Sequence, residues 1–333
     1  MSLARDLAPM PDYRPDQRVS GVIRCWGNPH MGAVLKRWEE GFRQYQPEIS
    51  FSDNLKSSAM GIFGLNEWTA ELALMGRQIY TYEFYGVYRR SLMLPVELEV
   101  ATGSLETPHK SFALAVFVHR DNPLARLTLK QLDGVFGEAR TGGWQGLAWS
   151  KDAARTAKGN IRSWGELGLT GEWAGAPIHV YGPPGIYPGG VTFFQNRVLG
   201  GGDTWAGGLQ EFEDRRKMMA ALDQDRYGIA YTGLCYQTAR TKPLALAERE
   251  GGPYVEITRA NVESRAYPLS RAVYIYFAPD TPGGEPANPK VDLKVREFLR
   301  YVLSRQGQEA VAGEGDFLPL TAENLRAQLK KLN

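Results

Sequence analysis

The segment from Ser111 to Leu124 reads SFALAVFVHRDNPL. Its apolar residues are continuous from Phe112 to Val118, which is short for a helix and rich in Val and Phe, so the segment predicts a strand buried on both faces. The Asp-Asn-Pro that follows ends the strand, because proline lacks an N–H and keeps the preceding residue out of helical geometry. A second buried strand is predicted at Leu269–Phe277. Two such buried strands predict that the chain passes twice between two lobes, which these hinge strands join.

Length and pattern extend this prediction to the whole chain. At 333 residues the chain is long enough for two domains, each with its own core. Strands alternate with helices, which predicts an α/β fold with mixed sheets and helices on both faces. We predict a discontinuous lobe I, residues 19–117 and 268–333, and a lobe II, residues 118–267.

Composition excludes several classes of protein. Lys plus Arg (39) nearly balances Asp plus Glu (37), so no global field favours nucleic acid or anionic membranes as partners. No run of about 18 apolar residues is present, so no transmembrane helix is predicted. Cys25 and Cys235 are expected in different lobes, which disfavours a disulfide. The polar, Pro-rich start resembles that of a mature secreted domain, so we expect a processed, periplasmic or secreted protein.

The first part of the chain repeats a strand, a loop and a helix. Strands are predicted at Gly21–Trp26, at residues 49–52 and at Gln78–Thr81, and helices at Gly32–Tyr45 and Ile62–Met75. Strands that alternate with helices predict a parallel sheet, and parallel sheets bind ligands at the carboxyl ends of their strands. The loops after these three strands should therefore lie side by side at that place. The loops begin at Asn28, at Lys56 and at Tyr82.

In the second part, residues 138–160 show no clean period and are predicted to be an inserted loop. A Gly/Pro-rich loop from Gly182 to Gly190 leads into a helix that starts near Val191. Residues 281–289 are predicted to form a polar loop before a helix at Val291–Leu303.

Enzyme motifs are missing from the sequence. Four histidines and two cysteines show no metal-ligand spacing, and neither a G-x-S-x-G elbow nor a P-loop occurs. Ser57 or Ser58 with His30 could still form a hydrolytic pair through spatial contacts. Without a recognisable nucleophile and base, we expect no enzyme, no cofactor and no bound metal.

Six short segments occur in an order that resembles the phosphate-binding-protein-like family of periplasmic solute receptors, the extracytoplasmic components of phosphate-type ABC transporters. The resemblance spans roughly residues 21–320. The segments that carry it are Val118–Leu124 with Leu127–Leu129, Phe136-Gly137 with Ser163-Trp164, Gly228–Tyr231, Ser270-Arg271 with Val273–Tyr276, Leu303–Gln308, and Leu318–Leu320. The resemblance implies a two-lobed, type II periplasmic-binding-protein-like fold.

In that family an anion is held between the lobes by loop N–H groups, hydroxyls, an Arg and an Asp. Helix N-termini suit this task, since they present unpaired N–H donors and a partial positive charge. The resemblance implies that the ligand-binding residues here are Asn28, His30, Met31, Ser57, Ser58, Ala59, Tyr82, Glu83, Tyr187, Gly189, Gly190 and Thr192.

This chain departs from the family pattern in two places. The family's phosphate receptors carry an Arg and an Asp just before Ser-Gly-Thr, whereas residues 182–192 keep only the hydroxyl of Thr192. Tyr82-Glu83 stands where a small hydroxyl and an acid or Arg are usual, so the Tyr82 ring could fill part of the site. A dianion without a guanidinium partner would be held less well.

Each candidate also has a structural interpretation. Ser57 and Ser58 could be helix caps, the glycines 189 and 190 could serve a positive-φ turn, and Glu83 could be a solvated carboxylate or the partner of a site Arg. His30 could be a surface residue. Arg120 and Arg271 are interpreted as structural ion-pairing residues.

The function predicted from these observations is that of an extracytoplasmic solute-binding protein. It would be a monomer whose lobes close over phosphate or a similar small anion by hinge motion and deliver it to an ABC permease. The alternative is a binding-fold protein with a degenerate site that acts as a sensor or interaction module.

Overall fold

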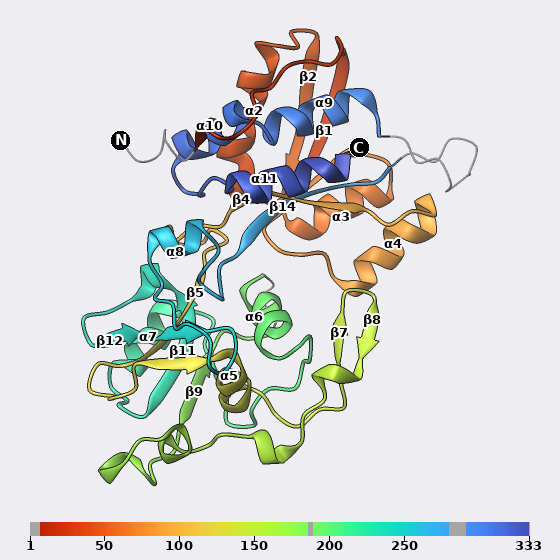
Figure 1. The fold of residues 1–333 in the computed structure, drawn as a ribbon. Coiled ribbons are helices and arrows are strands. Elements are labelled where there is room, and N and C mark those ends of the chain that lie inside the picture. Colours follow the sequence, from red (N-terminus) through yellow and green to blue (C-terminus); the bar gives the residue numbers. More distant parts are fainter. Residues whose placement is uncertain (1–6, 186–188, 280–290, 333) are drawn as a thin grey trace. The chain divides into compact units, whose positions relative to one another are not determined.

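The computed structural model describes residues 7–185, 189–279 and 291–332. The chain divides into two compact units, each with its own five-stranded sheet (Figure 1). Unit 1 comprises residues 1–104, 109–111 and 272–333, and unit 2 comprises residues 105–108 and 112–271. The predicted boundary at 117/118 falls inside strand β5 (Leu114–His119), which pairs with β11 and β12 of unit 2. The structural boundaries are therefore Ser111/Phe112 and Arg271/Ala272.

The sheet of unit 1 has the strand order β2-β1-β3-β14-β4. Strands β1, β2 and β3 run parallel, and β14 is antiparallel to both β3 and β4, so the sheet is mixed as predicted. The elements of unit 1 are β1 (Gly21–Gly27), η1 (Pro29–Met31), α2 (Gly32–Arg43), β2 (Ile49–Leu55), α3 (Ser58–Asn66), β3 (Leu72–Met75), α4 (Thr81–Ser91), β4 (Val96–Thr102), β14 (Ala272–Phe277), α9 (Leu293–Val302), α10 (Arg305–Glu314), α11 (Ala322–Leu329) and η8 (Lys330–Leu332).

Helices cover both faces of this sheet. Leu72 and Leu74 of β3 join one core with α2, α9 and α10, whereas Ala73 and Met75 join a second core with α3 and α4 (Figure 1). Successive strand residues point to opposite faces, which is why β3 is buried on both sides. Because helices cover both faces of the sheet, polar groups that could bind a ligand are expected at the strand ends and in the loops that follow them.

The structure corrects the prediction for residues 62–83. The predicted helix Ile62–Met75 is instead α3 followed by strand β3. The predicted strand Gln78–Thr81 does not form, since residues 78–80 are irregular and Thr81 begins α4. The four-residue run LALM is buried on both faces and carries no strand period, so it could not be distinguished from the end of a helix. As a consequence, the loop after the third strand begins at Gly76 rather than at Tyr82.

The sheet of unit 2 has the order β10-β9-β11-β5-β12. Strands β9, β10 and β11 run parallel, and β5 is antiparallel to β11 and β12. The other elements of unit 2 are β6 (Arg126–Thr128), α5 (Leu129–Phe136), β7 (Gly143–Gln145), β8 (Ala148–Ser150), η2 (Lys151–Ala153), η3 (Ala157–Gly159), η4 (Trp164–Leu167), η5 (Gly171–Trp173), β9 (His179–Gly182), α6 (Gly190–Val198), β10 (Gln210–Glu211), α7 (Arg215–Leu222), β11 (Gly228–Gly233), η6 (Leu234–Tyr236), β12 (Thr241–Pro243), β13 (Ala245–Ala247) and α8 (Arg259–Glu263).

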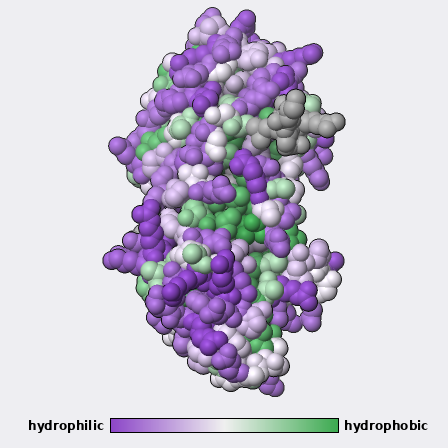
Figure 2. Space-filling view, turned by 90° about the vertical axis from the view of Figure 1, so that its left-hand side faces the viewer, coloured by the Kyte–Doolittle hydropathy of each residue, from purple (hydrophilic) through white to green (hydrophobic). Residues whose placement is uncertain are grey.

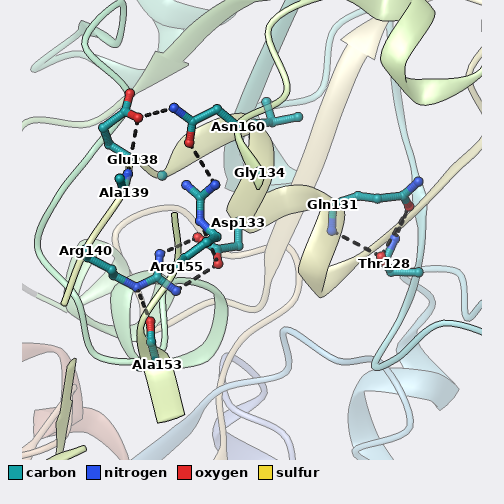
Figure 3. A network of polar contacts seen from close by, with 12 residues as sticks. Thr128, Gln131, Asp133, Gly134, Glu138, Ala139, Arg140, Ala153, Arg155 and Asn160 are labelled. Carbon is teal, nitrogen blue, oxygen red and sulfur yellow. Dashed lines mark hydrogen bonds and ion pairs between the residues drawn. The ribbon is translucent and has the colours of Figure 1, made fainter. Parts of the chain in front are cut away.

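Residues 138–160 are attached to α5 by ion pairs rather than by an apolar core. Asp133 of α5 binds the guanidinium of Arg140 through both carboxylate oxygens, at 2.6 and 2.8 Å, and lies 3.3 Å from Nε of Arg155 (Figure 3). Arg155 also donates to Asn160 at 2.8 Å. The segment predicted to be a loop contains the β7–β8 hairpin and two short turns, and its anchors are charged, which explains its lack of hydrophobic period.

Other expectations concern the cysteines, the surface and one loop. Cys25 and Cys235 are both free and lie in different units, as predicted. Hydrophilic residues predominate on the face drawn in Figure 2. Within residues 7–185, 189–279 and 291–332, no helix has the length and apolar character needed to cross a bilayer. The loop predicted at 281–289 lies outside the described residues.

Candidate functional site

Three loops of unit 1 meet at one edge of its sheet. Gly27, the last residue of β1, pairs with Leu55 of β2 and with Leu74 of β3. The backbone N–H of Asn28 then donates to the carbonyl of Leu74 at 2.8 Å. Because the three strands are parallel, the loops that follow them leave the sheet side by side, which is the usual place for a ligand in such sheets.

Asn28 and Ser58 are brought into direct contact by this arrangement. Asn28 is the N-cap of η1, where its Oδ1 accepts a hydrogen bond from the N–H of His30 at 2.9 Å. Its Nδ2 donates to Oγ of Ser58 at 3.1 Å, and the N–H of Gly76 donates to the same oxygen at 3.2 Å. Ser58 Oγ therefore joins the three loops, and as a double acceptor it has its own hydrogen to donate.

Gly76 and Ser111 complete this cluster, and the sequence analysis missed both. Ser111 Oγ donates to the carbonyl of Gly76 at 2.8 Å. A Cβ on Gly76 would lie 2.6 Å from Nδ2 of Asn28 and 2.8 Å from Oγ of Ser111, so any larger residue would displace these two side chains from the cluster. The signal that could have found Gly76 was its place directly after β3, which the predicted helix at 62–75 concealed.

Ser57 has a different task from Ser58. Its side chain caps α3 and accepts a hydrogen bond from the N–H of Met60 at 3.2 Å. Ser58 and Ala59 occupy the first two positions of α3, and backbone N–H groups there have no partner within the helix. The first turn of α3 thus points donors and a partial positive charge at the same edge of the sheet.

His30 and Met31 lie on opposite sides of the first loop. Met31 is fully buried and belongs to the apolar core of unit 1. His30 is exposed, and its carbonyl accepts a hydrogen bond from Lys110 at 2.8 Å. Partial desolvation, together with the charges of Lys110 and His109, lowers the pKa of His30. His30 therefore favours its neutral form in a basic neighbourhood.

Tyr82 and Glu83 belong to helix α4 and not to a loop, because the third strand ends at Met75. Tyr82 is 69% exposed and stacks on Tyr80 with ring centroids 5.4 Å apart. Glu83 is buried, accepts a hydrogen bond from the N–H of Tyr80 at 2.8 Å, and forms an ion pair with Arg77. Of the two alternatives for Glu83, the ion pair with an Arg is the one observed.

Arg77 follows Gly76 directly and is the charged residue of the third loop. Both of its terminal nitrogens bind Glu83, at 2.8 and 2.7 Å, and its Cζ lies 3.8 Å from the centre of the Tyr80 ring. Burial lowers the pKa of Arg77 and the contact with Glu83 raises it, and the contact prevails. Nε of Arg77 is buried and has no hydrogen-bond partner among the described residues. A buried donor of this kind suits an anionic ligand.

In unit 2 the predicted residues gather at the first turn of α6. Gly189 is the N-cap, with φ of +92°, a conformation that favours glycine. Gly190 is the first residue of the helix and Thr192 the third. Tyr187 lies outside the described residues. This turn presents backbone donors without a side-chain cap from residue 189.

Comparisons with known proteins show the family to which the chain belongs. The model of the PBP superfamily domain matches residues 101–306, more than half of the chain. The phosphate-binding protein PstS of Pseudomonas aeruginosa is 30% identical over 97% of this chain and 90% of its own length. This chain belongs to the PstS family of phosphate-binding proteins. The family resemblance found in the six sequence segments is thereby confirmed.

Solved structures with the same fold include further members of this class. PstS from Borrelia burgdorferi has a TM-score of 0.58 at 15% identity and covers 91% of this chain and 100% of its own. An ABC-type phosphate transport receptor from Vibrio cholerae has a TM-score of 0.56 at 17% identity, covering 89% and 99%. At these identities the likeness concerns the fold, and it confirms the predicted α/β architecture of periplasmic binding proteins. The PstS family members named here are binding proteins.

Proposed function

We propose that this chain is an extracytoplasmic solute-binding protein that captures phosphate, or a similar small oxyanion, for an ABC transporter. The observation that carries the proposal is the meeting of Asn28, Ser58 and Gly76 beside the first turn of α3, in a chain 30% identical to PstS over 97% of its length. We infer that it acts as a binding protein and not as an enzyme.

The chemistry of unit 1 supports an anionic ligand. Helix N-termini bind phosphate and sulfate because their N–H groups and dipole favour negative charge. Ser58 can donate its hydroxyl hydrogen, and Arg77 offers its buried Nε. The side chain of Glu83 is engaged by Arg77, so we assign it the role of holding that guanidinium and not that of touching the anion.

Unit 2 would add the first turn of α6, with Gly189, Gly190 and Thr192 as its anion-binding residues. We propose that one anion is held by groups of both units, with hinge motion closing them over it. We further propose that the protein is a periplasmic or secreted monomer and that it delivers the ligand to a membrane permease.

Calorimetric titration tests this function. The intact protein is titrated with phosphate, sulfate and acetate, alongside Ser58→Ala and the control Ser52→Ala, which removes an exposed hydroxyl of β2. We expect micromolar binding of phosphate by the unchanged protein and by Ser52→Ala, and at least tenfold weaker binding by Ser58→Ala. Silence of the unchanged protein toward all three anions would reject transport and favour a sensor or interaction module.

A further inference from the structure

Three residues between two pieces of unit 2 belong to unit 1. Residues 105–108 and 112–271 lie in unit 2, whereas residues 109–111 lie in unit 1. The chain therefore leaves unit 1 after Ser104, contacts it again for three residues and then enters the long segment of unit 2. Fixing so short a piece of chain costs conformational entropy, so specific contacts must offset that cost.

Lys110 contacts two acids and the first loop of the candidate site. Its Nζ lies 3.1 Å from Oε1 of Glu314 and 3.0 Å from Oδ2 of Asp316, and it donates to the carbonyl oxygen of His30 at 2.8 Å. The side chain of Lys110 is 12% exposed and that of Glu314 is 3% exposed, so water competes little for these contacts. Charge-assisted hydrogen bonds are short and strong, and three of them fix the ammonium group and with it the His30 carbonyl.

Ser111 makes a corresponding contact with the third loop. Its Oγ donates to the carbonyl oxygen of Gly76 at 2.8 Å, and the N–H of Gly76 donates to Oγ of Ser58 at 3.2 Å. Ser111 is buried, so its hydroxyl has little water to bond instead. The hydroxyl of Ser111 thus holds the backbone at the residue that contacts Ser58.

Two neighbouring residues therefore hold two different loops of the candidate site. The first loop carries Asn28 and the third carries Gly76, and both of these residues donate to Ser58. Donors and acceptors that are already ordered in the free protein cost less free energy when a ligand binds. Lys110 and Ser111 each act through a backbone carbonyl, so neither has to touch the anion.

We propose that Lys110 and Ser111 are positioning residues of the anion site, and this rests on the proposed function. Lys110 holds the first loop and Ser111 holds the third, so that Asn28 and Gly76 keep the Ser58 hydroxyl in the direction that binds the anion. The charge of Lys110 is balanced by two carboxylates, and Ser111 carries none, so the contribution of both residues is order in the loops rather than attraction of the anion.

The test separates positioning from charge and from stability. Lys110→Met removes the ammonium group, Lys110→Arg keeps a charged donor, and Ser111→Ala removes a hydroxyl without changing the charge. Lys36→Met is the matched control for Lys110→Met. Lys36 also joins two carboxylates of unit 1, the buried Glu39 and Asp53, but these contacts lie on α2 and β2 and not in the loops.

Calorimetric titration with phosphate measures the affinity of each variant, and urea denaturation measures its stability. We expect Lys110→Met to weaken phosphate binding about tenfold and Ser111→Ala about fivefold. Lys110→Arg should restore the affinity to within threefold of the unchanged protein, and Lys36→Met should stay within twofold. Both Lys→Met variants leave a buried carboxylate without its cation, so both should unfold at a lower urea concentration. A loss of affinity confined to Lys110→Met is then not a consequence of lower stability.

The outcomes separate this proposal from the proposed function. If the unchanged protein binds phosphate and both Lys110→Met and Ser111→Ala bind it as tightly as Lys36→Met does, the positioning role is overturned and the proposed function stands. Weaker binding by Lys110→Met alone would assign the effect to charge and also overturn positioning. If the unchanged protein binds no phosphate, both proposals are overturned. Should Lys110→Met fail to fold, Ser111→Ala decides, and phosphate affinity within twofold of Ser52→Ala would overturn the positioning role.

Discussion

Arg77 and Glu83 form a bidentate ion pair inside unit 1, with Nη1–Oε2 at 2.8 Å and Nη2–Oε1 at 2.7 Å. The two side chains are only 5% and 7% exposed. The pair joins the loop after β3 to the first turn of α4, because Glu83 also accepts from the N–H of Tyr80. It therefore fixes the direction of Arg77, whose Nε has no hydrogen-bond partner in the described part of the chain.

Glu83→Gln should lower the free energy of unfolding by about 3 kcal/mol, because it leaves the charge of Arg77 buried and uncompensated. Urea denaturation monitored by circular dichroism measures the change. Glu309→Gln is the control, since it breaks the exposed Arg305–Glu309 pair of the same unit and should cost less than about 1 kcal/mol. Equal losses in the two variants would contradict a special role for the buried pair.

Ser57→Ala should affect stability more than binding, because the Ser57 side chain caps α3. We expect it to lower the free energy of unfolding by about 1 kcal/mol and to change the dissociation constant for phosphate less than threefold. Ser58→Ala should instead weaken phosphate binding more than it lowers the free energy of unfolding, since the Ser58 hydroxyl accepts from both Asn28 and Gly76 in the loop cluster. Urea denaturation and calorimetric titration of both variants measure these two effects. A stronger loss of phosphate affinity in Ser57→Ala than in Ser58→Ala would contradict the assignment of capping to Ser57 and of ligand binding to Ser58.

Glu39 should make stability depend on pH. Its carboxyl is buried in α2 and accepts from Lys36 at 2.9 Å. Burial, reinforced by Asp53 and opposed by Lys36, raises the pKa of Glu39 to about 7. The unfolded carboxyl titrates near pH ~4.3, so the native state holds a proton that the unfolded chain releases. The stabilisation from this proton is complete below about pH 4.3 and is lost as the pH rises through about 7.

Glu39→Gln should therefore raise the free energy of unfolding at pH 8, on the order of 2 kcal/mol, and change it little near pH 5. Urea denaturation at pH 5, 6, 7 and 8 measures the difference. Glu40→Gln alters the exposed neighbour on α2 and should give a curve parallel to that of the unchanged protein. A Glu39→Gln curve that is also parallel would refute the raised pKa.

Asp133→Asn should loosen residues 138–160 without affecting the ligand. Asp133 neutralises Arg140 and lies 3.3 Å from Nε of Arg155 (Figure 3). We expect limited trypsin digestion to cleave within 138–160 at least tenfold faster, because the segment is held by these charges. Phosphate affinity should stay within threefold. Asp152→Asn, an exposed position in the same segment, is the control, and equal cleavage rates in both variants would exclude the anchoring role.

Local patterns predicted much of the fold. The strand Gly21–Trp26 and the helix from Gly32 agree with β1 and α2, because each has one clear face and a flanking turn signal. The predictions were wrong for residues 62–83, where LALM is buried on both faces and has no period. Helix α4 was missed because its N-cap is Tyr80, which is not among the usual capping residues.

The sequence by itself predicted two α/β units joined by buried strands at Ser111–Leu124 and Leu269–Phe277, with serine and glycine residues in the loops that follow the strands. These features depend on local periodicity and on the order of segments, which a chain carries without folding. Only the tertiary structure decided that Ser58, and not Ser57, joins Asn28 to Gly76, that Arg77 lies in the third loop, and that Lys110 binds the first loop. The physical reason is that such contacts form between residues 18 to about 80 positions apart in sequence, and strand pairing and burial alone bring them together.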